Sequence, residues 1–279
     1  MKWPAAFVLR VVIAGVLLTQ PVHVLGMQQV PQGYTATIHG AQLYYEIHGD
    51  GPPLVLLHGF GQTGRTWHPY LETLREQFRV IIPDLRGHGR STNPSEVFTH
   101  RQAAQDVFEL LDRLGVQSFR AMGISTGGMT LIHMATQQPD RVHAIVLIGA
   151  TTYFPEQARA IMRRVSPDSL TPEEWASNRA RHVHGDDQIR ALFSQFNGFK
   201  DSYDDMNFTP PYLSTISART LIVHGDRDRF FPVSIATEIY RSVPNGYLWI
   251  VPNGRHVPIS PDGPFIEVAL QFLRGAWEN

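Results

Sequence analysis

The amino-acid sequence predicts an α/β protein with a doubly wound, mostly parallel β-sheet and a helical insertion. Short apolar runs alternate along the chain with segments of helical periodicity, which is the pattern of parallel strands that helices bury on both faces. The 279 residues are 43% hydrophobic and 18% charged, so the chain can bury a large core. The stretch from Thr151 to Ala218 is far longer than an ordinary connection between two elements, and this predicts the insertion.

The N-terminal residues have the pattern of a secretory signal. Lys2 and Arg10 are the only Lys, Arg, Asp or Glu residues before Gly26, and the run Val11–Leu18 is wholly apolar. This run is too short to span a bilayer comfortably, because a spanning helix takes about 20 residues. Gly26 is a small residue where a signal peptidase would cut, so we predict a signal peptide over residues 1–26 and export to the periplasm or the exterior. The alternative is an uncleaved N-terminal segment that anchors the protein to the membrane.

The strands are predicted from short runs rich in β-branched and aromatic residues. Two such stretches from Tyr34 onward are bounded by glycines and predict an antiparallel hairpin. The apolar runs that follow predict buried parallel strands at Leu54–Leu57, Val80–Ile82, Phe119–Met122, Ala144–Ile148, Leu221–Val223 and Tyr247–Val251.

Helix boundaries are marked by capping residues. Thr99 followed by Gln102 predicts a capping box at the start of a helix that Gly115 ends, and a second helix is expected from about Thr126 until just before Pro139. Within the insertion, the run Thr171-Pro172-Glu173-Glu174 has a capping residue, a proline at the first helical position and a glutamate at the capping-box position. We therefore expect residues 151–216 to form a helical lid on a core made of residues 27–150 and 217–279.

Charge and cysteine content exclude several classes of function. The chain has 24 Lys and Arg against 25 Asp and Glu, a net charge of −1, so no basic surface for nucleic acid is predicted. It has no cysteine, which excludes disulfides, thiolate metal sites and a cysteine nucleophile. Any nucleophile must therefore be an oxygen or an amine.

The strongest chemical signal is the run Gly123-Ile124-Ser125-Thr126-Gly127, which lies between a predicted strand and a predicted helix. A serine on such a tight turn has a strained backbone, and the flanking glycines allow strand and helix to pass close together. The turn also offers free N–H groups at the start of the helix, which stabilise negative charge on a reacting carbonyl. Ser125 is therefore the candidate nucleophile.

A serine hydroxyl needs a base and a group that orients the base. Both are expected downstream, at the carboxyl ends of later strands. The loop after the strand at Leu221–Val223 offers two acids, Asp226 and Asp228, and the loop after the last strand offers His256. The order serine, acid, histidine is the one expected for this architecture.

At this point the chain from about Tyr34 to Trp277 resembles the α/β-hydrolase superfamily, and within it a serine esterase-like or lactonase-like branch with a helical lid. Three further motifs carry the resemblance: His58-Gly59-Phe60-Gly61, Asp84-Leu85-Arg86-Gly87-His88-Gly89-Arg90-Ser91 and Gly225-Asp226-Arg227-Asp228. The resemblance implies that Asp228 rather than Asp226 is the acid. It also implies an oxyanion hole made by the backbone N–H groups of Phe60 and Thr126. A bulkier apolar residue or glutamine is frequent in the family where Thr126 stands, a departure that bears on the shape of the pocket.

A serine nucleophile also points away from relatives that resemble haloalkane dehalogenases or epoxide hydrolases, which use an aspartate at this position. We expect an enzyme that cleaves a carboxylic ester or lactone of a small to medium apolar compound without a cofactor. The same residues would serve an amidase or iminopeptidase, a C–C bond hydrolase, a perhydrolase or an acyltransferase. A rival of another class is a non-catalytic protein that binds a small molecule on this fold.

Aromatic residues of the insertion are candidates for the substrate pocket. We select Phe154, Trp175 and Phe208 as pocket residues, although aromatics in a small lid also serve to pack it onto the core. Three further phenylalanines are spaced three apart and predict one helical stripe, with at least two of them in the core: Phe193, Phe196 and Phe199. His182 and His184 precede a glycine turn and are interpreted as polar lid residues, so no metal site is predicted.

Overall fold

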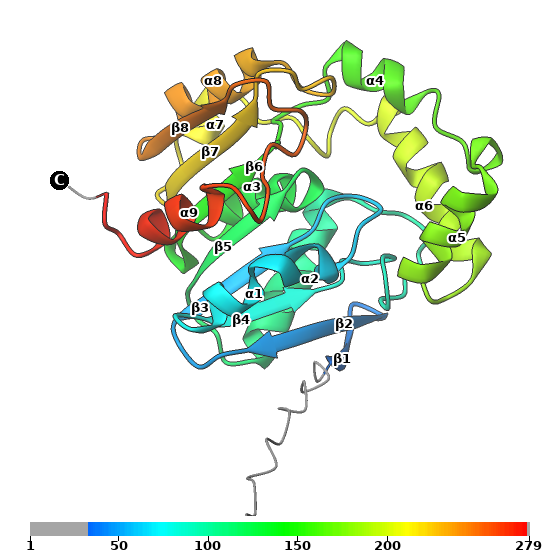
Figure 1. The fold of residues 1–279 in the computed structure, drawn as a ribbon, viewed down its shortest axis with the longest axis horizontal. Helices are drawn as coiled ribbons and strands as arrows, with labels where there is room; N and C mark the ends of the chain where they lie inside the picture. Colours follow the sequence, from blue (N-terminus) through cyan, green and yellow to red (C-terminus); the bar gives the residue numbers. More distant parts are fainter. Residues whose placement is uncertain (1–32, 278–279) are drawn as a thin grey trace, which may run out of the picture. The chain divides into compact units, whose positions relative to one another are not determined.

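In the computed structural model, which describes residues 33–277, eight strands form one sheet in the order β1-β2-β4-β3-β5-β6-β7-β8 (Figure 1). Strands β1 and β2 form the predicted antiparallel hairpin, β2 pairs antiparallel with β4, and the remaining neighbours pair in parallel. The predicted doubly wound α/β fold is thus confirmed. The predicted signal peptide, residues 1–26, lies outside the described residues.

Each predicted strand is present, extended by a few residues at its ends. Strands β3 to β7 are almost wholly buried because helices cover both faces of the sheet, whereas β8 is half-buried along its length as an edge strand. The strands are β1 (Gly33–Ile38), β2 (Ala41–His48), β3 (Pro53–Leu57), β4 (Arg79–Pro83), β5 (Phe119–Ile124), β6 (Val142–Ile148), β7 (Arg219–Gly225) and β8 (Gly246–Val251).

Helices cover the sheet from two sides (Figure 1). Alternate residues of a strand face opposite sides, so Val55 and Leu57 join one core cluster and Leu54 and Leu56 join the other. The first cluster includes side chains of α2 (His100–Arg113), α3 (Thr126–Gln137) and α8 (Val233–Ser242). The second includes side chains of α1 (His68–Arg75) and α9 (Phe265–Leu273). The short 3₁₀ helix η1 (Gly64–Trp67) adds the buried Trp67 to the second cluster, and a further 3₁₀ helix, η2 (Pro139–Arg141), precedes β6.

The helix starting after Thr99 begins as predicted but is capped differently. Thr99 Oγ1 accepts a hydrogen bond from Gln102 N at 3.0 Å, which is half of the predicted capping box. The other half is wrong, because the Gln102 side chain donates to Asp106 Oδ1 at 3.0 Å. Asp106 is buried and already binds both Nε and Nη2 of Arg86 at 2.7 and 2.8 Å. A buried carboxylate gains from each further donor, and Gln102 supplies one.

The predicted insertion lies between β6 and β7. It contains α4 (Glu156–Met162), η3 (Pro167–Ser169), α5 (Pro172–Arg181), α6 (Asp186–Gly198), η4 (Phe199–Asp201) and α7 (Pro210–Leu213). Figure 1 shows α4, α5 and α6 arching beside one end of the sheet. The capping box predicted for α5 is confirmed, since Thr171 Oγ1 accepts from Glu174 N at 3.2 Å and Glu174 Oε2 accepts from Thr171 N at 2.9 Å.

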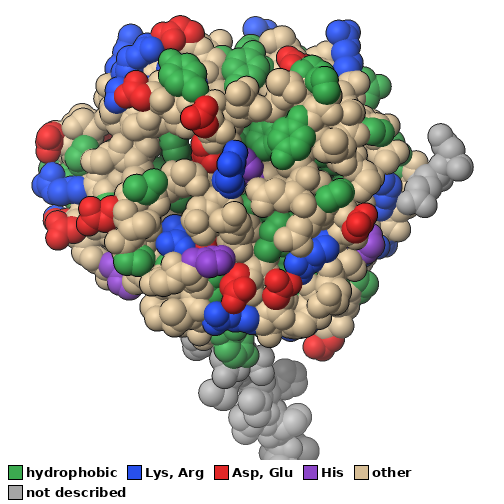
Figure 2. All heavy atoms as spheres, turned by 180° about the vertical axis from the view of Figure 1, so that it is seen from behind, with side chains coloured by type: hydrophobic (Ala, Val, Ile, Leu, Met, Phe, Trp, Pro, Cys, Tyr) green, Lys and Arg blue, Asp and Glu red, His purple; other side chains and the backbone are tan. Residues whose placement is uncertain are grey.

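The surface is consistent with a net charge close to zero. Figure 2 shows acidic and basic side chains interspersed over the face opposite to that of Figure 1, with hydrophobic side chains scattered among them. No field of one sign forms on this face. Within residues 33–277, the structure contains no helix that is both long and apolar enough for a membrane span.

The buried Arg159 connects the first helix of the insertion to the segment around η4. Arg159, on α4, is 6% exposed. Its Nε donates to Phe154 O at 2.9 Å and its Nη2 to Ser202 O at 2.8 Å, and its Nη1 donates to the carbonyls of Phe199 and Lys200. The guanidinium thus binds α4 to η4 through main-chain oxygens.

We expect Arg159→Met to lower the free energy of unfolding by about 3 kcal/mol, because several buried carbonyls lose their charged donor. Urea denaturation measures the change. Arg163→Met is the matched control, because Arg163 is an exposed residue of the same region and forms an ion pair with the exposed Glu156. Its effect should stay within about 0.5 kcal/mol. Equal effects of the two substitutions would show that Arg159 does not hold the insertion.

Candidate active site

Ser125 occupies a strained turn between β5 and α3. Its φ is 49° and its ψ is −111°, and its N–H donates to Ile148 O at 2.7 Å. The flanking glycines are needed there, as predicted. A Cβ at Gly123 would lie 2.4 Å from the carbonyl carbon of Gly127, and a Cβ at Gly127 would lie 2.3 Å from Leu57 O. The strand and the helix therefore approach so closely that Ser125 is held at the edge of the sheet.

His256 and Asp228 meet Ser125 at the same edge. His256 lies in the loop after β8 and Asp228 in the loop after β7. His256 Nδ1 donates to Asp228 Oδ2 at 2.8 Å, and the Ser125 hydroxyl donates to His256 Nε2 at 3.0 Å. The two loops cross where glycine is required, since a Cβ at Gly225 would lie 2.3 Å from Gly254 O. The three side chains thus form one continuous chain of hydrogen bonds.

The Asp228 carboxylate is held in its charged form by several donors. Its side chain is fully buried, and burial alone would raise its pKa. The hydrogen bond and charge of His256, with the N–H groups of Phe230 and Phe231 on Oδ1 at 2.7 and 3.2 Å, outweigh burial and lower the pKa below its ordinary value. Asp226, by contrast, is exposed and lies 3.8 Å from Arg227 Nε. The structure therefore brings Asp228, and not Asp226, to His256.

His224 is a neighbour of this group that the sequence reasoning missed. It lies buried at the end of β7, where its Nε2 donates to Phe231 O at 3.0 Å and is 3.7 Å from Asp228 Oδ2. Burial lowers the pKa of His224, so the ring is neutral and supports the loop that carries Asp228. His224 could have been predicted from the sequence, because it is the last large side chain of the strand and directly precedes the loop that carries Asp228.

The N–H groups of Phe60 and Thr126 lie free beside Ser125. Thr126 is the first residue of α3, so its N–H has no partner within the helix. The loop before Phe60 lies close to Ser125, since a Cβ at Gly59 would be 3.8 Å from Ser125 Cβ. Within residues 33–277, neither N–H has a hydrogen-bond acceptor. His58 fixes this loop, because its Nδ1 donates to Gly59 O at 2.8 Å and its Nε2 accepts from Leu85 N at 2.9 Å.

A cavity of about 200 Å³ opens beside Ser125 and is mainly apolar. Six phenylalanines line it, together with the site residues and a few aliphatic side chains. Phe154 was predicted to lie here as a pocket residue, and Phe60, Ser125, Thr126 and His256 were predicted as site residues, whereas the other lining residues were not selected from the sequence. The lining consists of Gly59, Phe60, Gln62, Ile124, Ser125, Thr126, Met129, Phe154, Met162, Phe196, Phe199, Phe230, Phe231, His256 and Val257.

Of the phenylalanine stripe on α6 and η4, only Phe199 is buried. Phe196 is partly buried and packs against the core, and both residues line the cavity. Phe193 is partly buried and faces a neighbouring cavity. The stripe therefore contributes both to the core and to the cavity walls. The spacing of the three residues does not show which of them has which role.

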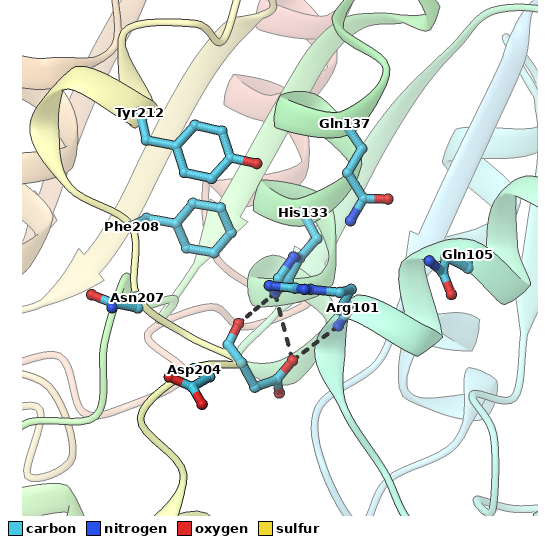
Figure 3. Close-up of a pocket in the computed structure, with 9 residues that line it drawn as sticks. Arg101, Gln105, His133, Gln137, Asp204, Asn207, Phe208 and Tyr212 are labelled. Atoms are coloured by element: carbon cyan, nitrogen blue, oxygen red, sulfur yellow. Dashed lines mark hydrogen bonds and ion pairs between the residues drawn. The ribbon is translucent and has the colours of Figure 1, made fainter.

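The assignment of Phe208 to the pocket at Ser125 is wrong. Phe208 lines a separate cavity of about 270 Å³ between α2, α3 and the end of the insertion (Figure 3). Its ring stacks on Tyr212 at 5.3 Å and meets His133 edge-on at 4.8 Å. The physical reason is main-chain pairing, because Phe208 N donates to Thr152 O at 3.0 Å and draws this segment away from Ser125.

Trp175 is also not part of this pocket. It lies on α5 near Arg179 and Arg190, whose guanidinium carbons are 5.3 and 5.2 Å from its ring. The indole serves as a surface platform for two arginines that are themselves paired with Asp186 and Asp168. An aromatic residue count in the insertion does not reveal which way each ring points.

The polar residues beside the site bind backbone. Buried His182 accepts from Gly89 N at 3.0 Å through Nδ1 and donates to Gly61 O at 3.3 Å through Nε2, and His184 contacts Arg90 O at 3.0 Å. Across the described part of the chain, no three His, Asp or Glu side chains are grouped to hold a metal ion.

In the separate cavity of Figure 3, His133 donates to Asp205 O at 2.7 Å and links α3 to the insertion.

Comparison with known proteins identifies related chains. A family model described as "alpha/beta hydrolase fold" matches residues 52–215. The chain is 28% identical to the putative carbamate hydrolase RutD of Caulobacter sp. (strain K31), with 86% of this chain and 98% of the relative covered. It is 29% identical to the serine hydrolase BPHL of Homo sapiens, with 78% of each chain covered.

Solved structures share the fold. The enol-lactonase from Burkholderia xenovorans LB400 superimposes with a TM-score of 0.66 at 24% identity, covering 87% of this chain and 98% of the other. At this identity the likeness concerns the fold alone.

We expect His182 to make stability depend on pH. Burial lowers the pKa of His182 to about 4, below the value of about 6.5 for an unfolded chain. The unfolded state therefore binds a proton first, and the contribution of His182 to stability is lost as the pH falls from about 6.5 through 4. His182→Gln should reduce the slope of unfolding free energy over this range by about 1.4 kcal/mol per pH unit.

Urea unfolding at a series of pH values measures the slope. His184→Gln is the control, because His184 is exposed and should leave the slope unchanged. An identical slope in His182→Gln and the unsubstituted protein would contradict the assignment.

Proposed function

Because the chain belongs to the α/β-hydrolase fold family, it is a hydrolase, and we propose that it is a serine hydrolase acting on a carboxylic ester or lactone of a small to medium apolar compound. The observation that carries the proposal is the hydrogen-bonded chain from Asp228 through His256 to Ser125, at the wall of a phenylalanine-lined cavity. A hydroxyl, a base and a buried carboxylate in this arrangement are the parts that acyl transfer to serine needs.

In the proposed reaction, Ser125 Oγ attacks the carbonyl carbon while its proton passes to His256 Nε2. The carbon–oxygen bond to the leaving alcohol then breaks, and His256 returns the proton to the departing oxygen. Water next gives a proton to His256 and attacks the acyl carbon. The bond between that carbon and Ser125 Oγ then breaks, and His256 returns the proton to Oγ, which releases the acid and restores the serine. Asp228 keeps Nδ1 protonated and stabilises the positive imidazolium in both halves.

The oxyanion would be stabilised by main-chain N–H groups. Phe60 N and Thr126 N lie beside Ser125 without acceptors among the described residues, and Thr126 begins α3, where the helix dipole favours negative charge. Such donors are oriented before the reaction starts, so they stabilise the tetrahedral intermediate without reorganisation. This supports the assignment of Phe60 and Thr126 as the oxyanion hole.

The apolar lining favours an ester or lactone over more polar substrates. Six phenylalanines around the serine offer contacts to an aliphatic or aromatic acyl group. The same three side chains would serve a carbamate, which is what the Caulobacter relative is named for, or an amide, a C–C bond or acyl transfer. The residues of the insertion that face the cavity, Phe154, Met162, Phe196 and Phe199, support the interpretation of the insertion as a lid.

We expect a fluorophosphonate probe to form a covalent adduct with the folded protein, and Ser125→Ala to abolish it. Asp228→Asn should lower kcat for a nitrophenyl ester by about 10⁴-fold, because the base loses its orientation. Asp226→Asn is the matched control in the same loop and should stay within about twofold, because Asp226 does not contact His256. Mass spectrometry and ester kinetics give the readouts. A folded protein that forms no adduct would contradict the assignment of Ser125 as the nucleophile.

We also propose that the protein is exported, or else anchored by an uncleaved N-terminal segment, on the pattern of Lys2, Arg10 and the apolar run Val11–Leu18. N-terminal sequencing of the chain after cell fractionation tests this. A chain that starts at about residue 27 outside the cytosol is expected for export. A full-length chain in the membrane fraction would indicate the anchor, and a full-length chain in the cytosol would rule out both.

A further inference from the structure

A second cavity adjoins the one at Ser125. It has a volume of about 370 Å³ and lies against α5 and α6; we call it the α5–α6 chamber. Three residues, Phe60, Gln62 and Phe196, line both cavities, so the two spaces are neighbours on either side of these side chains. A substrate whose carbonyl lies at Ser125 would reach the chamber by passing these three side chains. The other lining residues are Gly61, Val165, Leu170, Glu174, Ser177, Asn178, Arg181, His182, Leu192 and Phe193.

Arg181 is the notable charged group of this chamber. Its Nη2 donates to Asn178 Oδ1 at 3.2 Å, and its Nε is shielded from solvent without an acceptor. Within residues 33–277, no carboxylate lies within ion-pair distance of Arg181. Arg179, two residues before Arg181 on the same helix, is paired with Asp186 at 2.7 Å. A partly buried guanidinium without a counter-ion is unfavourable. A ligand anion that pairs with it would therefore gain binding free energy from a charge-assisted hydrogen bond.

The remaining polar groups leave this charge available. Glu174 also lines the chamber, but its Oε2 accepts from Thr171 N at 2.9 Å and so is bound to the start of α5. Asn178 is buried, and its Nδ2 donates to Glu174 O at 2.8 Å, which holds the amide that orients Arg181. His182 is engaged with Gly61 O and Gly89 N and carries no charge near neutral pH.

We propose that Arg181 binds a carboxylate of the substrate, so that the preferred substrate is an ester or lactone with an apolar segment at the reacting carbonyl and a carboxylate several bonds away. This inference rests on the proposed function, because it places the carbonyl at Ser125. The phenylalanines of the first cavity would contact the apolar segment, and the chamber would receive the charged end. Arg181 is then a specificity-determining residue that takes no part in the proton transfers.

Kinetics with matched pairs of substrates test the proposal. The first series is the 4-nitrophenyl hemiesters of straight-chain diacids from adipate to sebacate, each compared with its methyl-capped counterpart, which lacks the charge. A second series places the carboxylate on the alcohol side, as acetate esters of ω-hydroxy acids against their methyl esters. We expect kcat/KM of the unsubstituted enzyme to favour the charged member by at least about tenfold at one chain length in one series.

Arg181→Gln should lower kcat/KM for that charged substrate by about 10- to 100-fold and leave the methyl-capped one within about twofold. Arg181→Lys should retain part of the preference. Arg179→Gln is the matched control, because Arg179 is exposed on the same helix and outside the chamber, and both members of the pair should react unchanged. No preference in the unsubstituted enzyme, or an equal loss for both members in Arg181→Gln, overturns the proposal.

A binding measurement separates this inference from the proposed function. Calorimetry on the Ser125→Ala variant measures binding of monomethyl suberate, with and without Arg181→Gln, and needs no turnover. Binding that Arg181→Gln weakens by tenfold or more supports the carboxylate site even if ester hydrolysis fails. Hydrolysis of neutral esters with no charge preference, and equal binding in both variants, leaves the proposed function standing and removes the role of Arg181.

Discussion

The close approach of the β5–α3 turn to its neighbours is the constraint on which the rest of the site depends. Ser125 keeps a φ of 49° because β5 leads directly into α3, and Gly127 lies so near Leu57 O that no side chain fits between them. Thr126 starts α3 directly after this turn, so its N–H has no helical partner and lies next to the loop of Phe60. Strain in one residue thus creates both the exposed hydroxyl and the donors beside it, and the packed sheet beneath sustains that strain.

Burial of a carboxylate is the second constraint, and it explains the loop architecture. A fully buried Asp228 stays ionised only because His256, Phe230 N and Phe231 N all donate to it. Neutral His224 donates a hydrogen bond to Phe231 O, so it supports the turn that supplies two of these donors. Asp226 lies in the same loop but receives none of these three hydrogen bonds. The two acids therefore differ in their surroundings, although their positions in the chain are similar.

Much of the fold and the three residues that meet at the sheet edge could be predicted from the sequence, because their signals are local. Apolar runs, capping residues and the glycines around Ser125 each act within a few positions. The cavity walls could not be predicted in this way. Phe208 and Phe154 are both aromatic residues of the insertion, and only tertiary pairing decides that the first turns toward His133 and the second toward Ser125. The Gln102 side chain bonds instead to Asp106, four residues on in the same helix, and the sequence does not show that Asp106 is buried and paired with Arg86.

The insertion is attached to the core through buried polar contacts, and this couples the shape of the cavity to distant residues. The Asp205 carboxylate accepts from the backbone N–H and the ring of His100, at 2.9 and 2.6 Å, and the latter ring contacts Phe154 and Phe199. Those two phenylalanines face Ser125, and Arg159 binds the carbonyls of both. The position of the cavity wall is therefore set by a carboxylate and a guanidinium that do not line the cavity. Both groups hold main-chain atoms, so a substitution at Asp205 or Arg159 would act on the cavity wall through the backbone that carries Phe154 and Phe199.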